Sequence, residues 1–254
     1  MIVLHRLTTL LITLLTAGVF AILLFNPSNL LLAGVLGIVV IPILFSRLLK
    51  WEAKRFVFWV FLLLPMLLLL SAVFFFFFLE GEILKYSVGI LVTLCMWLYT
   101  ESVFEFYHLP SSYQAYTLEY LSLAFSILSA FFFSSGMYAM GLFMQLPIWV
   151  PAIVLGLFSW FASMMVLWVS KISFARAIRF SIVCAVCMAQ VYIVLSLLPT
   201  SFLSNACGFA VFIYTFLGLS RAQALGKLSK TVVLRYLSVA VLLLVIIFLT
   251  ARWI

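Results

Sequence analysis

The sequence predicts an all-α protein, a polytopic bundle of about nine transmembrane helices. Hydrophobic residues make up 68% of its 254 positions and charged residues only 8%, whereas soluble domains carry about 25% charged residues. A water-soluble fold could not bury this much apolar surface, but a bilayer is itself an apolar solvent. A transmembrane barrel requires alternating apolar and polar residues, and the apolar runs 62–70 and 74–78 do not alternate.

Nine apolar runs approach the ~20 residues that a helix needs to cross the hydrocarbon core. They cover residues 7–25, 30–46, 56–79, 86–106, 118–140, 148–170, 180–198, 202–220 and 236–251. The first run resembles a signal peptide in its preceding positive charge, but it is longer than the ~7–15 residues of a signal core and no clear cleavage site follows. We therefore expect residues 1–254 to form a single integral membrane domain with no soluble domain.

Turn residues and prolines mark several boundaries between and within these runs. Residues 26–29, Asn-Pro-Ser-Asn, are typical of a tight turn into the second span. Pro147 and Pro199 lie in later turns. Pro42 and Pro65 lie within the second and third spans. Because proline removes a helical hydrogen bond, we expect kinks at these two positions.

The basic residues predict the orientation of the chain. With a cytoplasmic N-terminus, twelve of the fourteen Lys and Arg residues fall on the cytoplasmic side, as the positive-inside rule requires. We therefore predict a multi-pass protein of the cytoplasmic (inner) membrane. Each span that is removed moves all later loops to the other side of the membrane. The later basic loops therefore stay inside only if spans are removed in pairs. The alternative to nine spans is thus seven, with 86–106 and 118–140 forming a re-entrant hairpin.

Polar chemistry is concentrated between residues 101 and 119. Glu101, Glu105, His108 and Glu119 provide three of the six acidic residues and one of the two histidines, in a chain without Asp. On a helix, Glu101, Glu105 and His108 share one face. Carboxylates one turn apart in a medium of low dielectric can bind a cation or relay a proton, and ionisable groups within spans are functional candidates. These four residues, which we call the polar set, form the predicted ligand or proton/cation site.

Two structural alternatives to this site remain open. Five of the ten tyrosines lie between residues 99 and 120, as is typical of a membrane–water interface, so this stretch would be a helix end, a loop and a helix start among headgroups. Alternatively, Glu101 or Glu119 forms a structural ion pair. The candidate partners for that pair are Arg47, Arg176 and Arg221.

Metal and cofactor sites are not expected. Glu105 and His108 have the spacing of a carboxylate–imidazole metal pair, but the other histidine, His5, lies at the far N-terminus. Cys184 and Cys187 fall within an apolar run, where we interpret them as packing residues. We expect the isolated amides Gln190 and Asn205 to form interhelical hydrogen bonds.

The composition narrows the possible functions. The basic residues form no patch interleaved with aromatic residues, so nucleic acid is not an expected partner. No glycine-rich phosphate loop is present. We predict a non-enzymatic membrane protein, surrounded by the lipid bilayer, that handles a small solute, ion or lipid within the bundle, as a transporter would. The alternative is a scaffold or assembly subunit with a membrane-protein partner or as a homo-oligomer, and a membrane-embedded enzyme ranks third.

Overall fold

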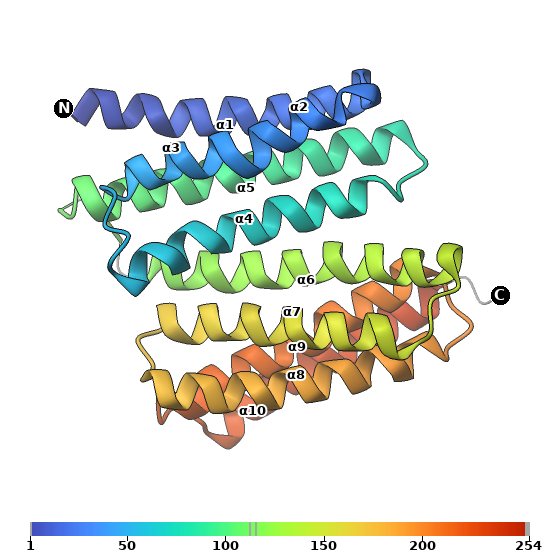
Figure 1. Cartoon of the computed structure of the whole chain (residues 1–254). Coiled ribbons are helices and arrows are strands. Elements are labelled where there is room, and N and C mark those ends of the chain that lie inside the picture. Colours follow the sequence, from blue (N-terminus) through green and yellow to red (C-terminus); the bar gives the residue numbers. More distant parts are fainter. Residues whose placement is uncertain (1, 112, 115, 252–254) are drawn as a thin grey trace. The chain divides into compact units, whose positions relative to one another are not determined.

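The computed structural model describes residues 2–111, 113–114 and 116–251 (Figure 1). The chain is 84% helical, and its described residues form no strand. In chain order the elements are α1 (Ile2–Phe25), the 3₁₀ turn η1 (Pro27–Asn29), α2 (Leu30–Val35), the π-helix η2 (Leu36–Val40), α3 (Ile41–Leu48), α4 (Phe56–Phe76), α5 (Glu82–His108), α6 (Thr117–Met144), α7 (Trp149–Val169), α8 (Phe174–Ser196), α9 (Phe202–Ala224) and α10 (Lys230–Thr250). The predicted all-α fold class is confirmed.

Nine helical segments in the described ranges are long and apolar enough to cross a membrane. Eight are single helices, and the second, Leu30–Leu48, combines α2, η2 and α3. Helices α5 and α6 contain 27 and 28 residues, or about 40 Å each at a rise of about 1.5 Å per residue. Each can cross a hydrocarbon core of about 30 Å without turning back, which favours nine spans over seven. The chain is therefore a multi-pass membrane protein.

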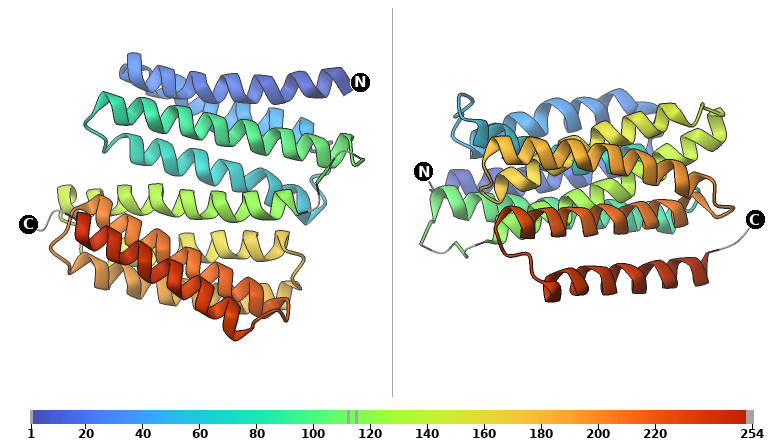
Figure 2. Two further views of the ribbon diagram at one scale, coloured as in Figure 1. Left: turned by 180° about the vertical axis from the view of Figure 1, so that it is seen from behind. Right: turned by 90° about the horizontal axis from the view of Figure 1, so that it is seen from below.

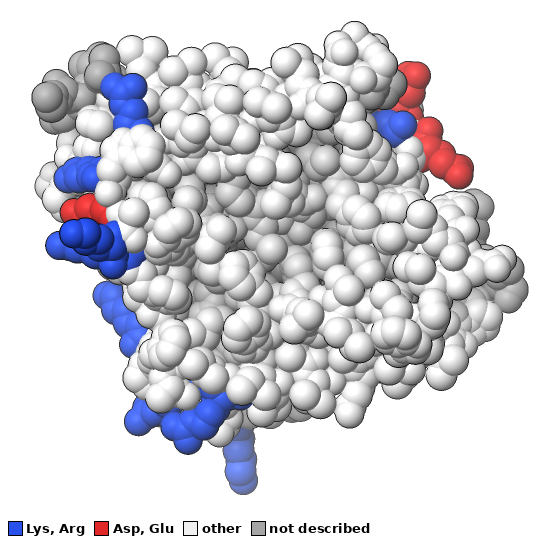
Figure 3. Space-filling model, in the orientation of Figure 1, with Lys and Arg blue, Asp and Glu red and all other residues white. Residues whose placement is uncertain are grey.

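Charged side chains avoid the middle of the helices. On the face drawn in Figure 3, Lys, Arg and Glu side chains lie towards the helix ends, and the surface between them is uncharged. This distribution fits membrane-spanning helices, because a charge in the hydrocarbon core is costly.

The chain divides into two compact units, Met1–Leu121 and Ser122–Ile254. The single membrane domain stays a prediction. In the first unit, α1 packs against α5, α2 and α3, and α4 packs against α5 and α3. A Cβ atom at Gly89 of α5 would lie 3.1 Å from Cβ of Phe20 on α1, so these two helices approach closely. The buried Tyr99 hydroxyl donates to the Phe61 carbonyl at 3.3 Å and joins α5 to α4.

The two prolines within spans have different surroundings. The π-helix η2 ends just before Pro42, which is the second residue of α3. Proline cannot donate to the carbonyl one turn earlier, and π turns within helices are one recognised cause of a kink. Pro65, by contrast, lies inside the continuous helix α4. The structure thus interrupts the regular helix near only one of the two prolines.

The second unit is built around α7, α8 and α9. Helix α7 packs against α8 and α9, and α8 packs against α9. A Cβ atom at Gly156 of α7 would lie 3.2 Å from the Ala185 carbonyl oxygen of α8, so these backbones nearly touch. Helix α10 packs on α9 at the edge of this unit (Figure 2), and only 6% of its most apolar window is buried.

Candidate functional site

Three residues of the polar set occupy the last two turns of α5, beside the first turns of α1. Arg6 Nη2 lies 3.5 Å from Glu101 Oε1. The Thr9 hydroxyl donates to Glu101 Oε2 at 3.4 Å. A structural ion pair is one of the alternatives considered above, but Glu101 forms it with Arg6 rather than with Arg47, Arg176 or Arg221. The Glu101 carboxylate is thus engaged with α1.

The two histidines of the chain contact each other. The rings of His5 and His108 are tilted by 35° with their centroids 4.4 Å apart, and Phe104 stacks on His108 at 5.2 Å. His5 is remote from His108 in sequence, but α1 and α5 run antiparallel and bring the two rings together. Sequence alone gives one usable signal for this pairing: the predicted topology places both residues at cytoplasmic helix ends.

Three of the four ring nitrogens of this histidine pair are buried. His5 Nδ1 and both nitrogens of His108 have no hydrogen-bond partner among the described residues. In the described ranges no group of three or more His, Cys or Glu residues could hold a metal ion.

The other two members of the polar set lie apart from the Arg6 ion pair. Glu105 is half-buried one turn beyond Glu101 on α5, and no ion pair joins it to a described residue. Glu119 is 9% exposed in the first turn of α6. The functional role of the four residues stays a prediction.

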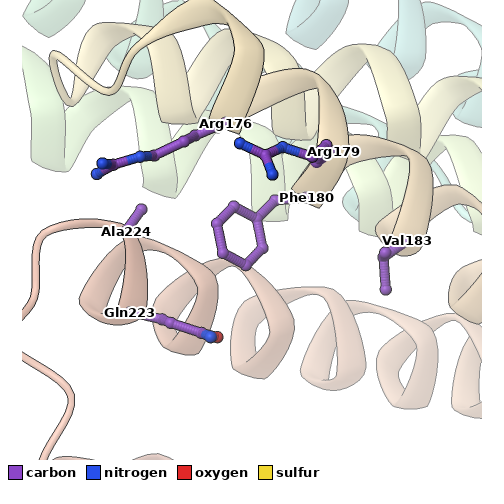
Figure 4. Close-up of a pocket in the computed structure, with 6 residues that line it drawn as sticks. All are labelled: Arg176, Arg179, Phe180, Val183, Gln223 and Ala224. Atoms are coloured by element: carbon purple, nitrogen blue, oxygen red, sulfur yellow. The ribbon is translucent and has the colours of Figure 1, made fainter.

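A different set of side chains forms a cleft in the second unit, which we call the basic pocket. It has a volume of about 410 Å³ and lies between α8 and α9 (Figure 4). Its lining consists of Arg176, Arg179, Phe180, Val183, Gln223 and Ala224. In Figure 4 both guanidinium groups lie above the end of α9, and the Phe180 ring lies beneath Arg179. The pocket therefore combines two positive charges with an apolar floor.

The floor of the basic pocket is fixed by the core of its unit. Phe180 and Ala224 pack against a cluster of buried residues that includes Met164, Leu167 and Ala177. This cluster joins α7 and α8, and Ala224 adds the end of α9. The packing of α7, α8 and α9 thus fixes the positions of Arg176 and Arg179 on α8.

A second cavity, which we call the apolar groove, lies further along α8. It has a volume of about 510 Å³ between α8, α9 and α10. Its lining consists of Cys187, Gln190, Val191, Val194, Leu195, Leu198, Phe212, Leu244 and Phe248. The exposed Gln190 side chain makes no hydrogen bond to the residues that the structure describes, so the interhelical bond expected of it is absent there. Asn205 instead accepts from the Thr200 hydroxyl at 2.6 Å, in the turn before α9.

The basic pocket and the apolar groove lie on one face of α8. Their shared face carries positions 176, 180, 183, 187, 190 and 194, which recur every three or four residues as a helical stripe does. Arg176 and Cys187 are about 16 Å apart along the axis, at about 1.5 Å per residue. The same spacing is visible in the sequence. There, however, Arg176 and Arg179 are explained equally well as signals of membrane orientation, so the sequence does not indicate a pocket.

Charge is divided unequally between the two units. All six Glu residues lie in residues 1–121, together with six of the fourteen Lys and Arg residues. Residues 122–254 carry the other eight and no acidic side chain: Lys171, Arg176, Arg179, Arg221, Lys227, Lys230, Arg235 and Arg252. The second unit therefore holds the whole net charge of +8 and has no carboxylate side chain of its own to balance it.

The comparisons with known proteins give no family. No protein-family model, no curated protein sequence and no solved structure matches this chain. The structure thus identifies a multi-pass membrane protein with a basic pocket and an apolar groove on one helix face.

Proposed function

We propose that the protein is a non-enzymatic lipid-handling protein that takes a lipid hydrocarbon chain into the apolar groove. The lining of the groove carries this proposal. Aliphatic and aromatic side chains dominate it, and Gln190 offers a single amide. A hydrated ion or small solute would lose its water there without new hydrogen bonds, which is costly. A hydrocarbon chain has no such penalty, and the volume is within the usual range of ligand pockets.

Substitution within the groove tests the proposal. Val194→Trp fills the groove, and Val186→Trp, an equally large change at another exposed position of α8 outside it, is the matched control. The assay is photolabelling of the purified full chain in nanodiscs by a phospholipid with a photoreactive group in its acyl chain. We expect Val194→Trp to reduce labelling of α8 and α10 severalfold and Val186→Trp to leave it unchanged. Equal labelling of both variants and the parent would refute a lipid-binding groove.

The proposal includes the cytoplasmic membrane and a cytoplasmic N-terminus. The grouping of the basic residues supports this orientation. Single cysteines introduced in the loops at positions 52 and 228, in a chain without its natural cysteines, would react with a membrane-impermeant thiol reagent only after the cells are opened. Reaction of both cysteines in intact cells would show the opposite orientation, with these loops outside.

A proton- or cation-handling role of the polar set is a second candidate. The buried histidine nitrogens without partners among the described residues favour it, and the engagement of Glu101 with Arg6 argues against an open cation site. Glu105→Gln and Glu101→Gln should each change a pH-dependent flux or ligand affinity of the reconstituted protein. Unaltered behaviour of both variants would leave the polar set with a structural role. A membrane-protein partner or a homo-oligomer stays a prediction, which the mass of the complex in nanodiscs checks.

A further inference from the structure

We propose that the basic pocket binds the phosphate headgroup of an anionic phospholipid, whose acyl chains run along α8 towards the apolar groove. This inference rests on the proposed lipid-handling function and names the class of lipid. It concerns Arg176, Arg179 and Gln223 at one end of the helix face, and Cys187, where the groove begins.

The chemistry of the basic pocket selects an anion. Neither Arg176 nor Arg179 forms an ion pair within the described ranges. Arg179 donates from Nε to the Ala175 carbonyl at 3.3 Å. This bond does not involve the two terminal nitrogens of the guanidinium group (Figure 4). A planar guanidinium binds phosphate through two parallel hydrogen bonds. Gln223 of α9 also lines the pocket.

The helix ends at the basic pocket do not cancel this preference. The first turn of α8 lies beside Arg176 and contributes the partial positive charge of a helix N-terminus. The C-terminus of α9, beside Ala224, contributes an opposite partial charge of about half a unit. Two full positive charges on the arginines exceed that contribution. The net field in the pocket therefore favours a negative group.

The counter-charge for the basic pocket must come from outside its unit. Residues 122–254 contain no acidic side chain and eight basic ones. A zwitterionic headgroup brings its own cation and leaves the charges of Arg176 and Arg179 unbalanced. A headgroup with a net negative charge reduces the excess of positive charge. Charge complementarity thus favours an anionic lipid over a zwitterionic one.

The apolar floor of the basic pocket and its distance from the groove favour a lipid over a soluble phosphate. Phe180 lies beneath Arg179 (Figure 4), and Phe180 and Val183 continue the face of α8 into the membrane-spanning segment. The distance of about 16 Å from Arg176 to Cys187 is close to one leaflet, half of a hydrocarbon core of about 30 Å. A phosphate held by Arg176 and Arg179 therefore lies at one interface, and its acyl chains reach the groove, which begins at Cys187. A soluble phosphate would leave this apolar floor uncovered.

The test compares headgroups on the purified full chain. Binding of phosphatidylglycerol and of phosphatidylcholine with the same acyl chains is measured by native mass spectrometry in a neutral detergent. The test variant is Arg176→Gln with Arg179→Gln, and the matched control is Lys227→Gln with Lys230→Gln, which removes the same charge from the next loop. A basic residue near an anionic lipid surface is worth about fivefold in affinity. We therefore expect the test variant to lose about thirtyfold in affinity for phosphatidylglycerol and little for phosphatidylcholine.

Three outcomes would overturn the headgroup assignment. One is an unchanged affinity of the test variant for phosphatidylglycerol. Another is an equal loss in the control variant, which would show a diffuse attraction of the basic loops. The third is displacement of the lipid by inorganic phosphate at a similar concentration, which would show that the apolar floor contributes nothing.

The headgroup assignment and the groove can fail separately. If acyl photolabelling still depends on Val194 but headgroup selectivity is absent, the lipid groove stands and the anionic headgroup falls. If headgroup selectivity depends on Arg176 and Arg179 but labelling ignores Val194, the groove falls. Arg176→Lys with Arg179→Lys provides a further readout. It keeps the charge but loses the bidentate geometry, so we expect it to retain part of the affinity that the glutamine variant loses.

Discussion

Gly218→Ala should weaken the packing of α10 on α9. Gly218 is buried on α9 and faces the Tyr236 ring of α10. A Cβ atom at this position would lie 2.5 Å from Cζ and 2.8 Å from Cδ1 of that ring, with Cε1 closer still. Tyr236 also contacts the Tyr214 ring of α9, with centroids 5.5 Å apart. Because so little of α10 is buried, the contact between Gly218 and the Tyr236 ring contributes a large share of the packing of α10.

The expected magnitude follows from two opposing effects. Overpacking by one methyl group at a fixed interface costs about 1–3 kcal/mol. Replacing glycine by alanine within a helix returns about 0.5–1 kcal/mol, because alanine loses less backbone entropy on folding. We therefore expect a net loss of about 1–2 kcal/mol in the free energy of unfolding. This is a change of about five- to thirtyfold in the equilibrium between docked and detached α10.

The measurement is unfolding of the full chain in mixed micelles, combined with protease sensitivity of the loop between α9 and α10. Gly34→Ala is the control, because a Cβ atom there meets nothing within 4 Å, and it should be neutral or slightly stabilising. In a background of Tyr236→Ala, the alanine at position 218 should no longer destabilise the protein. If Gly218→Ala behaves like Gly34→Ala, or if its cost persists without the Tyr236 ring, the α9–α10 packing described above is wrong.

Three further changes test other contacts. Glu101→Gln removes its ion pair with α1 and should lower the free energy of unfolding by about 0–1 kcal/mol in a salt-dependent way, whereas Glu80→Gln, in an exposed turn, should have no effect. His108→Phe keeps a ring against Phe104 and loses no hydrogen bond to a described residue, so thermal stability should be unchanged. His108→Ala removes the ring and should cost about 1–3 kcal/mol. A large loss of stability for the phenylalanine variant would show that the imidazole nitrogens have partners. Gly156→Val should cost about 1–3 kcal/mol in chemical unfolding, because the backbone carbonyl of Ala185 cannot move aside; a neutral result would contradict the close α7–α8 packing.

The membrane spans could be predicted because each depends on a local property. An apolar stretch of sufficient length is helical in lipid whatever its neighbours are, since only the helix satisfies its backbone groups within one segment. The predicted runs therefore agree with the helices of the structure, which mostly extend a few residues further at their ends. The extensions carry charged residues, such as Glu82, Arg176 and Lys230. An apolar run ends at such charged residues, but a helix can continue through them into the membrane interface.

The candidate sites could be predicted only in part, because a site depends on which helices are neighbours. The sequence places Glu101 and His108 on one helix face, and the structure keeps them there. Their partners, Arg6 and His5, come from α1, which is about a hundred residues away in sequence. No periodicity within a segment specifies such a neighbour.

The sequence by itself determined that this chain is a helical membrane protein, because composition, run length and the placement of charge are properties of individual segments. Only the tertiary structure decided which polar groups meet. It placed Arg6 beside Glu101, and it brought Arg176, Arg179 and Gln223 into the lining of one pocket. The physical reason is that lipid provides no hydrophobic force to pair one helix with another, so close packing selects the neighbours.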